Sequence, residues 1–374
     1  MTQNNPIAAL DIFSRLEDPR QAARVLYPLN ELILVALCAS ICGADSFVEF
    51  EEFGKAKLDF LRTLLPYENG VPSHDTFGAV FSNIDRKQFS ALFVEWARSL
   101  QEQIPGIVAI DGKTVRRSLN GKIPPIHVVS AWASEQNLVM GQVKTDVKSN
   151  EITAIPELLK MLVIKKALVS IDAMGCQKAI AEQITSQKAD YLLAVKRNQP
   201  ALYDEIALVF EAYDADMAPQ QIFEQEFLDK DHGRIERRIY SLTNEVNNLE
   251  AKANWPGLKC MGRVRSIREV NGKTSDETRY FISSRQLEVE EFAKAVRSHW
   301  GIENKLHWVL DIVFRDDENR ARIRNSAANL VTLKHITLNL LKMVIGKKSI
   351  RVKRKRAGLD DGFLLSVLQA PIGE

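Results

Sequence analysis

Three acidic residues have the types and settings needed for metal-dependent chemistry. Asp111 ends an apolar run that begins at Ile107, and Asp172 ends a second one at 167–171. Glu303 lies much later, in a segment with helical spacing. Carboxylate oxygens are the hard ligands that Mg²⁺ and Mn²⁺ prefer, and a pair of such ions drives phosphodiester chemistry on nucleic acid. We therefore expect a site for two Mg²⁺ or Mn²⁺ ions, although either aspartate alone is more often a turn or capping residue.

The two aspartates are expected to lie at one edge of a sheet. In the mixed sheet predicted from the element order, the first and fourth strands, which Asp111 and Asp172 end, would be parallel neighbours. The carboxyl ends of parallel strands meet at the same edge, which would bring the two side chains together. Two carboxylates this close repel each other strongly unless a cation lies between them.

The third acid would come from a helix. Four polar residues share one helical face because they are four positions apart: His299, Glu303, His307 and Asp311. A solvent-facing stripe also explains such a row, and a zinc site from the two histidines and the glutamate is a further alternative. Asp311 competes with Glu303, but eight residues of helix span about 12 Å, so both cannot reach one ion. We assign Glu303, which has the longer side chain and an aromatic and apolar frame.

The elements that position these acids follow from the hydrophobic pattern. Residues up to about 100 have helical spacing, at 29–43, 46–65, from Thr76 onward and at 86–103. Strands are then expected at 107–111, 126–133, 138–143, 167–172 and 191–195, with helices at 151–162 and 177–187. This order predicts an α/β fold with a mixed sheet and flanking helices, as in the ribonuclease-H-like architecture.

The remaining segments complete the predicted organisation. Short strand-like segments between 221 and 285 indicate a β-rich insertion, and helices are expected at 289–314 and 321–343. The predicted units are an N-terminal helical domain (1–103), the catalytic core (104–220), the insertion (221–285), the C-terminal core helices (286–345) and a basic tail (346–374). In that last segment, seven of the ten residues from Lys347 to Arg356 are basic, a block that either stays solvated or meets phosphate.

Composition favours a globular protein of the cytoplasm. The 374 residues are 45% apolar and carry a net charge of +2, so the overall charge says little about partners. Four scattered cysteines exclude a disulfide framework, and Cys38 and Cys42 fit core positions better than zinc ligands. No signal peptide is visible, and the longest apolar stretch, from Leu32 towards Ala44, is too short to span a bilayer. We expect a cytoplasmic, nucleoid-associated protein without a membrane partner.

Short motifs along the whole chain resemble one family. They are Asp18-Pro19-Arg20, Pro72–Phe77, Ile110–Arg116, Ile171–Gln177, Lys196–Gln199, His232-Gly233-Arg234 and His299–Trp308. In number and order they resemble the DDE-class insertion-sequence transposases, in the branch of H-repeat-associated proteins. The resemblance implies a ribonuclease-H-like fold with a β-strand insertion before the glutamate, an N-terminal family-associated domain, and Asp111, Asp172 and Glu303 as the acids. Two positions depart from it: Leu310 stands where relatives often have lysine, and Ala79 where they usually have arginine.

Basic residues near the acids are expected to hold the DNA backbone. They follow the first aspartate, follow the strand at 191–195, lie in the insertion, or precede Glu303: Lys113, Arg116, Arg117, Lys196, Arg197, Arg234 and Arg297. Such contacts give affinity and orientation rather than sequence. Arg234 belongs to a turn tip that is equally well a plain hairpin turn. Three residues are supporting candidates, with a purely structural role as the alternative for both histidines: His299, His307 and Asn198.

The function expected from the acids and the resemblance is that of a DNA transposase, which cuts and joins double-stranded DNA at the ends of an insertion sequence. Two DNA ends must be brought together, so a homo-oligomer on DNA is expected. A hydrolytic nuclease would use the same acids without joining ends. A catalytically silent DNA-binding relative and a zinc hydrolase are further alternatives.

Overall fold

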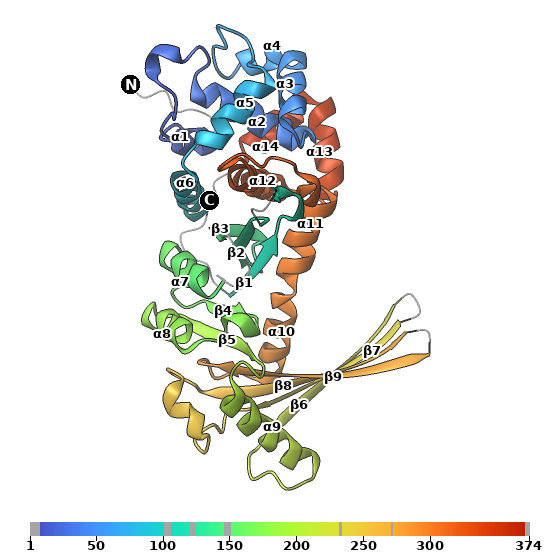
Figure 1. Cartoon of the computed structure of the whole chain (residues 1–374). Coiled ribbons are helices and arrows are strands. Elements are labelled where there is room, and N and C mark those ends of the chain that lie inside the picture. The colour runs from blue at the N-terminus through green and yellow to red at the C-terminus, as the bar shows by residue number, and fades with distance from the viewer. Residues whose placement is uncertain are drawn as a thin grey trace.

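A nine-stranded sheet runs from the middle of the molecule into a projecting arm (Figure 1). The computed structural model describes residues 8–100, 106–119, 121, 124–145, 151–231, 234–270 and 272–370. The strands are β1 (Ile107–Thr114), β2 (His127–Ala133), β3 (Leu138–Thr145), β4 (Leu168–Ile171), β5 (Asp190–Val195), β6 (Phe223–Asp231), β7 (Arg234–Thr243), β8 (Cys260–Val270) and β9 (Lys273–Ser283). Along the sheet they lie in the order β3-β2-β1-β4-β5-β9-β8-β7-β6.

The first five strands have the arrangement predicted from the sequence. β1 pairs antiparallel with β2 and parallel with β4, and β5 continues parallel to β4. The hairpin of β2 and β3 completes this half of the sheet. An antiparallel hairpin followed by parallel strands in this order is the ribonuclease-H-like architecture, and the predicted α/β fold class is confirmed.

The β-rich segment at 221–285 continues the same sheet. Its last strand, β9, pairs antiparallel with β5. The hairpins β6–β7 and β8–β9 then project from the body, and we call these four strands the arm (Figure 1). Of the residues at its tips, His232, Gly233 and Asn271 lie outside the described residues. Gly272 has a φ of +73°, the left-handed backbone that favours glycine in a tight hairpin turn, and it lies directly before β9.

Helices cover both faces of the core strands. α7 (Glu151–Met161) and α8 (Lys178–Ser186) pack on one face. On the other face α10 (Val289–His299) crosses β1 and β4, and α11 (Trp308–Ile312) follows it. Because side chains alternate along a strand, Ile107 packs with α10 whereas Val108 joins the opposite cluster. α9 (Pro200–Asp214), which the sequence analysis does not identify, packs against β9.

The first and last helices form one packed layer. They are α1 (Ala8–Phe13), α2 (Leu29–Cys42), α3 (Phe47–Ala56), α4 (Leu58–Arg62), α5 (His74–Asn83), α6 (Arg86–Ser99), α12 (Ser326–Met343), α13 (Ile350–Leu359) and α14 (Asp361–Leu368). α12 is buried along most of its length because α2, α5, α6 and β3 surround it. One apolar cluster includes both Phe13 and Leu368, so the two ends of the chain share a core. In the described ranges, no single helix is long and apolar enough to cross a membrane, and α2 with α3 passes that test only as a pair bent by 95°.

The basic segment near the C-terminus is not a solvated tail, because it forms α13 and docks. Lys353 Nζ donates hydrogen bonds to the carbonyl oxygens of Leu341 (2.9 Å) and Val344 (2.6 Å). Arg354 donates to the carbonyl oxygen of Ser40 and pairs with the Asp45 carboxylate at 2.8 Å. A buried cation is tolerated only when such partners replace its hydration. These two side chains therefore fasten α13 to α2 and to the end of α12.

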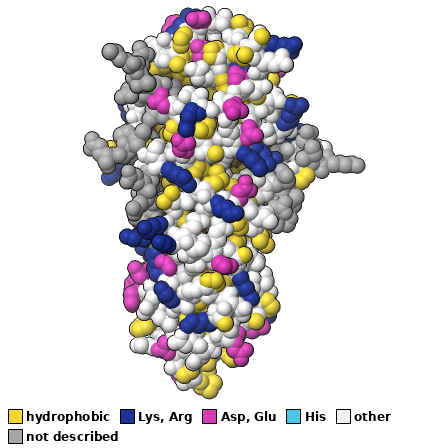
Figure 2. All heavy atoms as spheres, turned by 90° about the vertical axis from the view of Figure 1, so that its left-hand side faces the viewer, with side chains coloured by type: hydrophobic (Ala, Val, Ile, Leu, Met, Phe, Trp, Pro, Cys, Tyr) yellow, Lys and Arg dark blue, Asp and Glu magenta, His cyan; other side chains and the backbone are white. Residues whose placement is uncertain are grey.

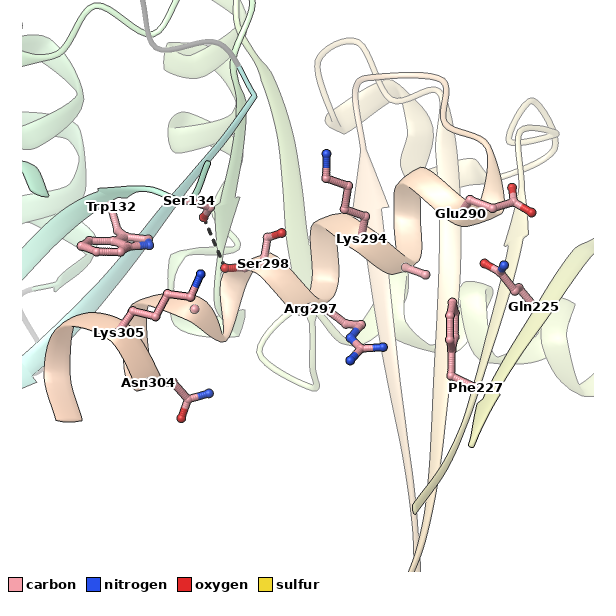
Figure 3. A pocket seen from close by; sticks show the side chains of 12 residues that line it. Trp132, Ser134, Gln225, Phe227, Glu290, Lys294, Arg297, Ser298, Asn304 and Lys305 are labelled. Carbon is pink, nitrogen blue, oxygen red and sulfur yellow. Dashed lines mark hydrogen bonds between the residues drawn. The ribbon is translucent and has the colours of Figure 1, made fainter. Parts of the chain in front are cut away.

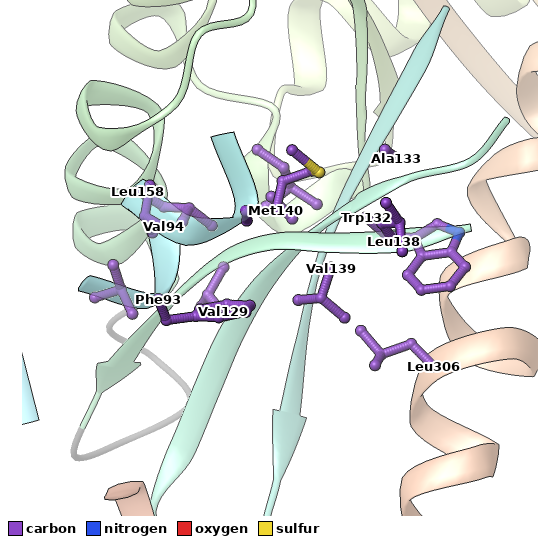
Figure 4. Packing of buried hydrophobic residues seen from close by; sticks show 14 of the residues in the cluster. Phe93, Val94, Val129, Trp132, Ala133, Leu138, Val139, Met140, Leu158 and Leu306 are labelled. Atoms are coloured by element: carbon purple, nitrogen blue, oxygen red, sulfur yellow. The ribbon is translucent and has the colours of Figure 1, made fainter. Parts of the chain in front are cut away.

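The core hairpin is enclosed on both faces and along its outer edge. Asn339 of α12 bonds both main-chain groups of Val139, accepting from its N–H (2.9 Å) and donating to its carbonyl (2.8 Å). This side chain satisfies an edge strand that would otherwise be open to pairing. Figure 4 shows the surrounding packing, with residues from α6, α7, β2, β3 and the helical segment after α10: Phe93, Val94, Val129, Leu158 and Leu306.

Candidate active site

Asp111 and Asp172 occupy equivalent positions on neighbouring strands. The last paired residues of β1 and β4 are Ile110 and Ile171, and each aspartate is the next residue in its chain segment. The prediction that these strands are parallel neighbours is confirmed. The strand pairing therefore brings the backbones of the two aspartates to one edge of the sheet.

The turn after Asp172 is held from two sides. Asp172 Oδ1 accepts hydrogen bonds from the backbone N–H groups of Met174 (3.0 Å) and Gly175 (3.3 Å), so the residue does cap a turn. From the loop after β5, Asn198 Nδ2 donates to the carbonyl oxygen of Ala173 at 2.7 Å. Both capping bonds use Oδ1 of Asp172. Asn198 thus bonds the backbone of the turn that Asp172 caps.

Asp111 lies where a lone negative charge is unfavourable. Burial raises the pKa of Asp111 to about 7; the Gly112 backbone N–H opposes this shift, and the carboxylates of Asp172 and Glu303 add to it. The three acids thus feel one another's charge, as a shared cation site requires. His307 Nδ1 lies 3.5 Å from Asp111 Oδ2, and burial lowers the pKa of His307 to about 3. The imidazole beside the carboxyl group is therefore neutral at physiological pH.

Three of the four polar residues expected on one helical face turn towards the sheet. Each contacts a residue of β4 or β1: His299 with Ser170 (3.1 Å), His307 with Asp111 (3.5 Å) and Asp311 with Lys113 (2.6 Å). The row is therefore not a solvent-facing stripe. Glu303, the fourth member of the row, is exposed, whereas His299, His307 and Asp311 are partly buried.

A π turn at Glu303–His307 interrupts the helix that was expected to run from 289 to 314. α10 ends at His299, and this wider turn separates it from α11. Turns of this kind insert one extra residue and often occur at functional sites. Burial raises the pKa of Glu303; the Arg279 guanidinium opposes the shift and the Asp172 carboxylate adds to it. Glu303 thus stands between the aspartates and the arginines of the arm.

The site fits Mg²⁺ or Mn²⁺ by its donor chemistry but is not preformed around an ion. Asp111, Asp172 and Glu303 supply hard oxygen ligands whose mutual repulsion a cation would relieve. Within the described ranges, however, no three His, Cys, Asp or Glu side chains are placed to hold one metal ion. The two histidines of the zinc alternative have separate partners, since His299 contacts Ser170 and His307 contacts Asp111.

An arginine-lined groove runs from Glu303 along the arm. Its volume is about 660 Å³, and its walls are α10 and one face of β7, β8 and β9. We call it the arm groove, and its cations are Arg234, Arg238, Arg268, Arg279 and Arg297. The sequence analysis names only the first and last of these. Side chains alternate between the two faces of a strand, and the register of β7, β8 and β9 places Arg238, Arg268 and Arg279 on the same face.

One buried acid organises these arginines. Glu236 is only 1% exposed, and it accepts hydrogen bonds from Arg238 (3.0 Å) and Arg268 (3.1 Å). Arg234 lies 3.5 Å from its second oxygen. Burial alone would raise the pKa of Glu236, but the neighbouring guanidinium groups of Arg268 and Arg238 lower it. The guanidinium groups are therefore held in place before any ligand arrives.

Lys113 faces the interior. It is 9% exposed, and its Nζ lies 2.6 Å from Asp311, 3.3 Å from Asp317 and 3.5 Å from Asp316. A buried charge needs such partners, and losing them would be costly. Lys113 is therefore not the exposed DNA contact that was expected, and its contacts instead join β1 to α11 and the segment after it.

Arg116 and Arg117 are exposed, as expected, and other exposed arginines follow in segment 320–324. Arg322 Nε donates to the Arg117 carbonyl oxygen at 3.0 Å. The exposed arginines of this loop cluster are Arg116, Arg117, Arg320, Arg322 and Arg324. On the face seen in Figure 2, by contrast, Lys and Arg are interspersed with Asp and Glu.

Lys196 and Arg197 are exposed in the loop after β5, as expected for the same edge of the sheet. The Arg197 guanidinium lies 4.9 Å from the centre of the Tyr203 ring and 3.6 Å from Asp204. These contacts orient Arg197 without burying it. The pair therefore stays available to a ligand at this edge.

A second hollow lies against α10 and is lined by residues of β2, the turn after it, and β6 (Figure 3). Its volume is about 590 Å³. Ser134 Oγ donates to the Ser298 carbonyl oxygen at 3.3 Å, and Trp132 is fully buried beside it. Arg297 lines both this hollow and the arm groove, so it can serve a ligand in either.

Comparisons with known proteins agree with the motifs. Residues 10–97 match the model of the DDE_Tnp_1-associated family, and residues 102–340 match that of the transposase DDE domain. The chain is 42% identical to "Putative transposase YncI" of Escherichia coli O157:H7, over 96% of this chain and 94% of that protein. It is 39% identical to "H repeat-associated putative transposase YhhI" of Escherichia coli K12, over 96% and 97%. A cryo-EM structure of the piggyBac transposase synaptic complex with hairpin DNA aligns with a TM-score of 0.44 at 12% identity, covering 98% of this chain and 82% of that one. With more than half of its length inside the DDE-domain match, the chain belongs to the transposase DDE-domain family, in the branch of the H repeat-associated proteins.

Proposed function

We propose that this protein is a DNA transposase that cleaves the ends of an insertion sequence and transfers them to target DNA. One observation carries the proposal: Asp111 and Asp172 directly follow the last residues that β1 and β4 pair with each other, and His307 of the helical segment that bears Glu303 contacts Asp111. The arm groove opens at that glutamate, so one of the three acids borders the arginines that would bind phosphate. Asp111, Asp172 and Glu303 are the proposed catalytic acids.

The same three residues would hold two Mg²⁺ or Mn²⁺ ions. When bound, such ions activate the attacking oxygen and stabilise the leaving oxygen of a phosphodiester. Asp172 would use Oδ2, because its Oδ1 caps the following turn. His307 would hold the Asp111 carboxylate in place as a neutral neighbour. Glu303 would complete the ligand set by turning from the arm groove towards the aspartates.

Double-stranded DNA is the proposed partner. Guanidinium groups bind phosphate oxygens in a fixed, forked geometry, which suits the arm groove to one strand of a duplex. The loop cluster together with Lys196 and Arg197 would contact the backbone on the sheet edge. We further propose a homo-oligomer that holds two DNA ends, in the cytoplasm and on the nucleoid.

The test is strand cleavage by purified protein. Asp111→Asn, Asp172→Asn and Glu303→Gln should each abolish nicking of a duplex that carries the element's ends, in the presence of Mg²⁺. Asp276→Asn and Glu226→Gln are matched controls, because these acids pair with Arg265 and Arg237 on the other face of the arm. Full activity in any of the three site variants would exclude that acid from the site.

Two alternatives use the same features. A hydrolytic nuclease would nick DNA and never join a 3′ end to a target, so a strand-transfer assay separates it from a transposase. A silent DNA-binding relative would bind DNA without nicking; among the relatives, one that is 43% identical over 65 residues is named "Inactive transposase YbfQ". Titration with Mn²⁺ would then show no saturable binding that depends on Asp111.

A further inference from the structure

The exposed cations of segment 347–356 form a patch that the proposed site does not use. Lys353 and Arg354 are buried and fasten α13, whereas the other five cations point outward. We call these five the α13 patch: Lys347, Lys348, Arg351, Lys355 and Arg356. Of these, within the described residues, only Arg356 has an acidic partner, Asp360 at 3.6 Å.

The α13 patch gathers its cations within one short segment. Some exposed cations elsewhere have a carboxylate close by, as in Lys55 with Glu51 (2.6 Å) and Arg265 with Asp276 (2.6 Å). A row of unpaired cations repels itself, and a polyanion that lies along it relieves the repulsion and releases its own counterions. The patch therefore fits a ligand with regularly spaced phosphates.

The patch is fixed to the helical segment that carries Glu303. The Arg354 guanidinium donates to the carbonyl oxygen of Val313 and lies 4.2 Å from the centre of the Phe314 ring, just after α11. Ten residues separate Glu303 from Val313, which is about 15 Å at the rise of a helix. That length corresponds to about four or five base pairs of a duplex at about 3.4 Å each. In Figure 1, α13 lies on the same side of the molecule as α11 and the projecting arm.

We propose that the α13 patch binds the phosphate backbone of the same DNA duplex whose other end lies in the arm groove. The inference rests on the proposed function and extends it, because it names a second anchor. The segment from Glu303 to Phe314 borders the arm groove at one end and contacts α13 at the other, so a duplex bound at both anchors would lie along this segment. Contacts of this kind depend on charge and are independent of base sequence.

The experiment compares two triple variants with the same change in charge. Lys347, Lys348 and Lys355 are changed to Gln in the patch variant. Lys160, Lys165 and Lys188 are changed to Gln in the control, because they are exposed near the ends of the parallel strands that lie away from the acids. The dissociation constant for a fluorescein-labelled duplex of mixed sequence is measured by anisotropy over a range of salt concentrations. Thermal unfolding checks that each variant folds.

We expect the patch variant to bind more weakly and to lose about two to three units from the slope of log K against log salt, since each phosphate contact contributes about 0.9. The control should keep the slope of the unchanged protein. An unchanged slope in the patch variant overturns the inference, and if its sedimentation then shows a lost dimer, α13 contacts a second copy instead. If the double variant Arg268→Gln, Arg279→Gln lowers the slope while the patch variant does not, the result supports DNA binding in the arm groove and overturns only the proposal that the α13 patch binds the duplex. A wild-type protein without measurable DNA binding overturns both.

Discussion

His307 Nδ1 lies 3.5 Å from Asp111 Oδ2, so a histidine that is neutral at physiological pH rests against the first of the proposed catalytic acids. The contact joins the π turn that follows α10 to the middle of β1. It places a side chain of the helical segment with Glu303 directly beside Asp111.

His307→Gln should lower metal-dependent nicking by about 10- to 100-fold, as is typical for residues that orient a metal ligand. The Mg²⁺ concentration for half-maximal activity should rise, because the carboxylate loses its fixed position. Thermal stability should change little. His74→Gln is the control, since this exposed histidine pairs with Glu51 in the N-terminal helices. Wild-type metal dependence in His307→Gln would show that the histidine is purely structural.

The stability of the metal-free protein should fall as pH rises towards neutrality. Burial raises the pKa of Asp111 from 3.8 to about 7. The Gly112 backbone N–H lowers this pKa, and the Asp172 and Glu303 carboxylates raise it further. An acid with a higher pKa in the folded state binds more protons when folded, so the free energy of unfolding decreases between about pH 4 and 7. The decrease is on the order of 4 kcal/mol, from a shift of about three units.

Asp111→Asn should therefore stabilise the metal-free protein at pH 8 and leave its stability at pH 4 unchanged. Mg²⁺ should raise the melting temperature of the unchanged protein at pH 8 and have little effect on the variant, because a ligand stabilises only the state that binds it. Urea unfolding at both pH values, with Asp276→Asn as control, measures this. If Asp111→Asn were less stable than the unchanged protein at pH 8, the ionised Asp111 carboxylate could not be destabilising the fold through its burial and its acidic neighbours.

Asp316→Ala should destabilise the fold by about 3 to 5 kcal/mol, because it leaves Lys334 and Lys113 buried without a shared counter-ion. Burial alone would raise the pKa of Asp316, but the Lys334 and Lys113 ammonium groups lower it below 3.8. A lowered pKa adds stability above the unfolded value, and that gain is lost as pH falls through the folded value. The loss therefore appears below about pH 4 in the unchanged protein. Glu318→Ala, a change at an exposed neighbour, is the control in urea unfolding, and equal midpoints for the two variants would contradict the prediction.

The two faces of the arm should differ in their use of DNA. Arg268→Gln with Arg279→Gln removes two cations from the arm groove and should reduce the salt slope of DNA binding by about two. Arg237→Gln with Arg265→Gln removes two cations from the opposite face, where each pairs with a carboxylate. This matched variant should keep the slope. Equal losses in both would mean that the arm acts through net charge alone.

Local pattern was sufficient for the core of the sheet. Apolar runs that stop at Asp111 and Asp172 predict parallel neighbouring strands, and β1 and β4 do pair in parallel up to Ile110 and Ile171. The predicted end of the first strand at Asp111 is wrong, because β1 continues to Thr114 through its pairing with β2. The row from His299 to Asp311 predicts one helical face, and three of its members do contact the sheet. The motifs predict the family that the comparisons show. The strands and the helical face depend on side-chain periodicity, which can be recognised within a short stretch of sequence.

Tertiary structure alone decided which charges are available. Lys113 and Arg354 look like the surface cations beside them in sequence, yet aspartates and carbonyl oxygens from distant segments hold them in the interior. Arg268 and Arg279 are distant from Glu303 in the sequence. They line the arm groove together with Glu303 because β9 pairs with β5 and so joins the arm to the core sheet. Strand pairing over such separations, and the burial that follows from it, depend on how the whole chain packs and have no local signature. The sequence by itself determined which residues could do the chemistry, and the packed fold decided which of them meet.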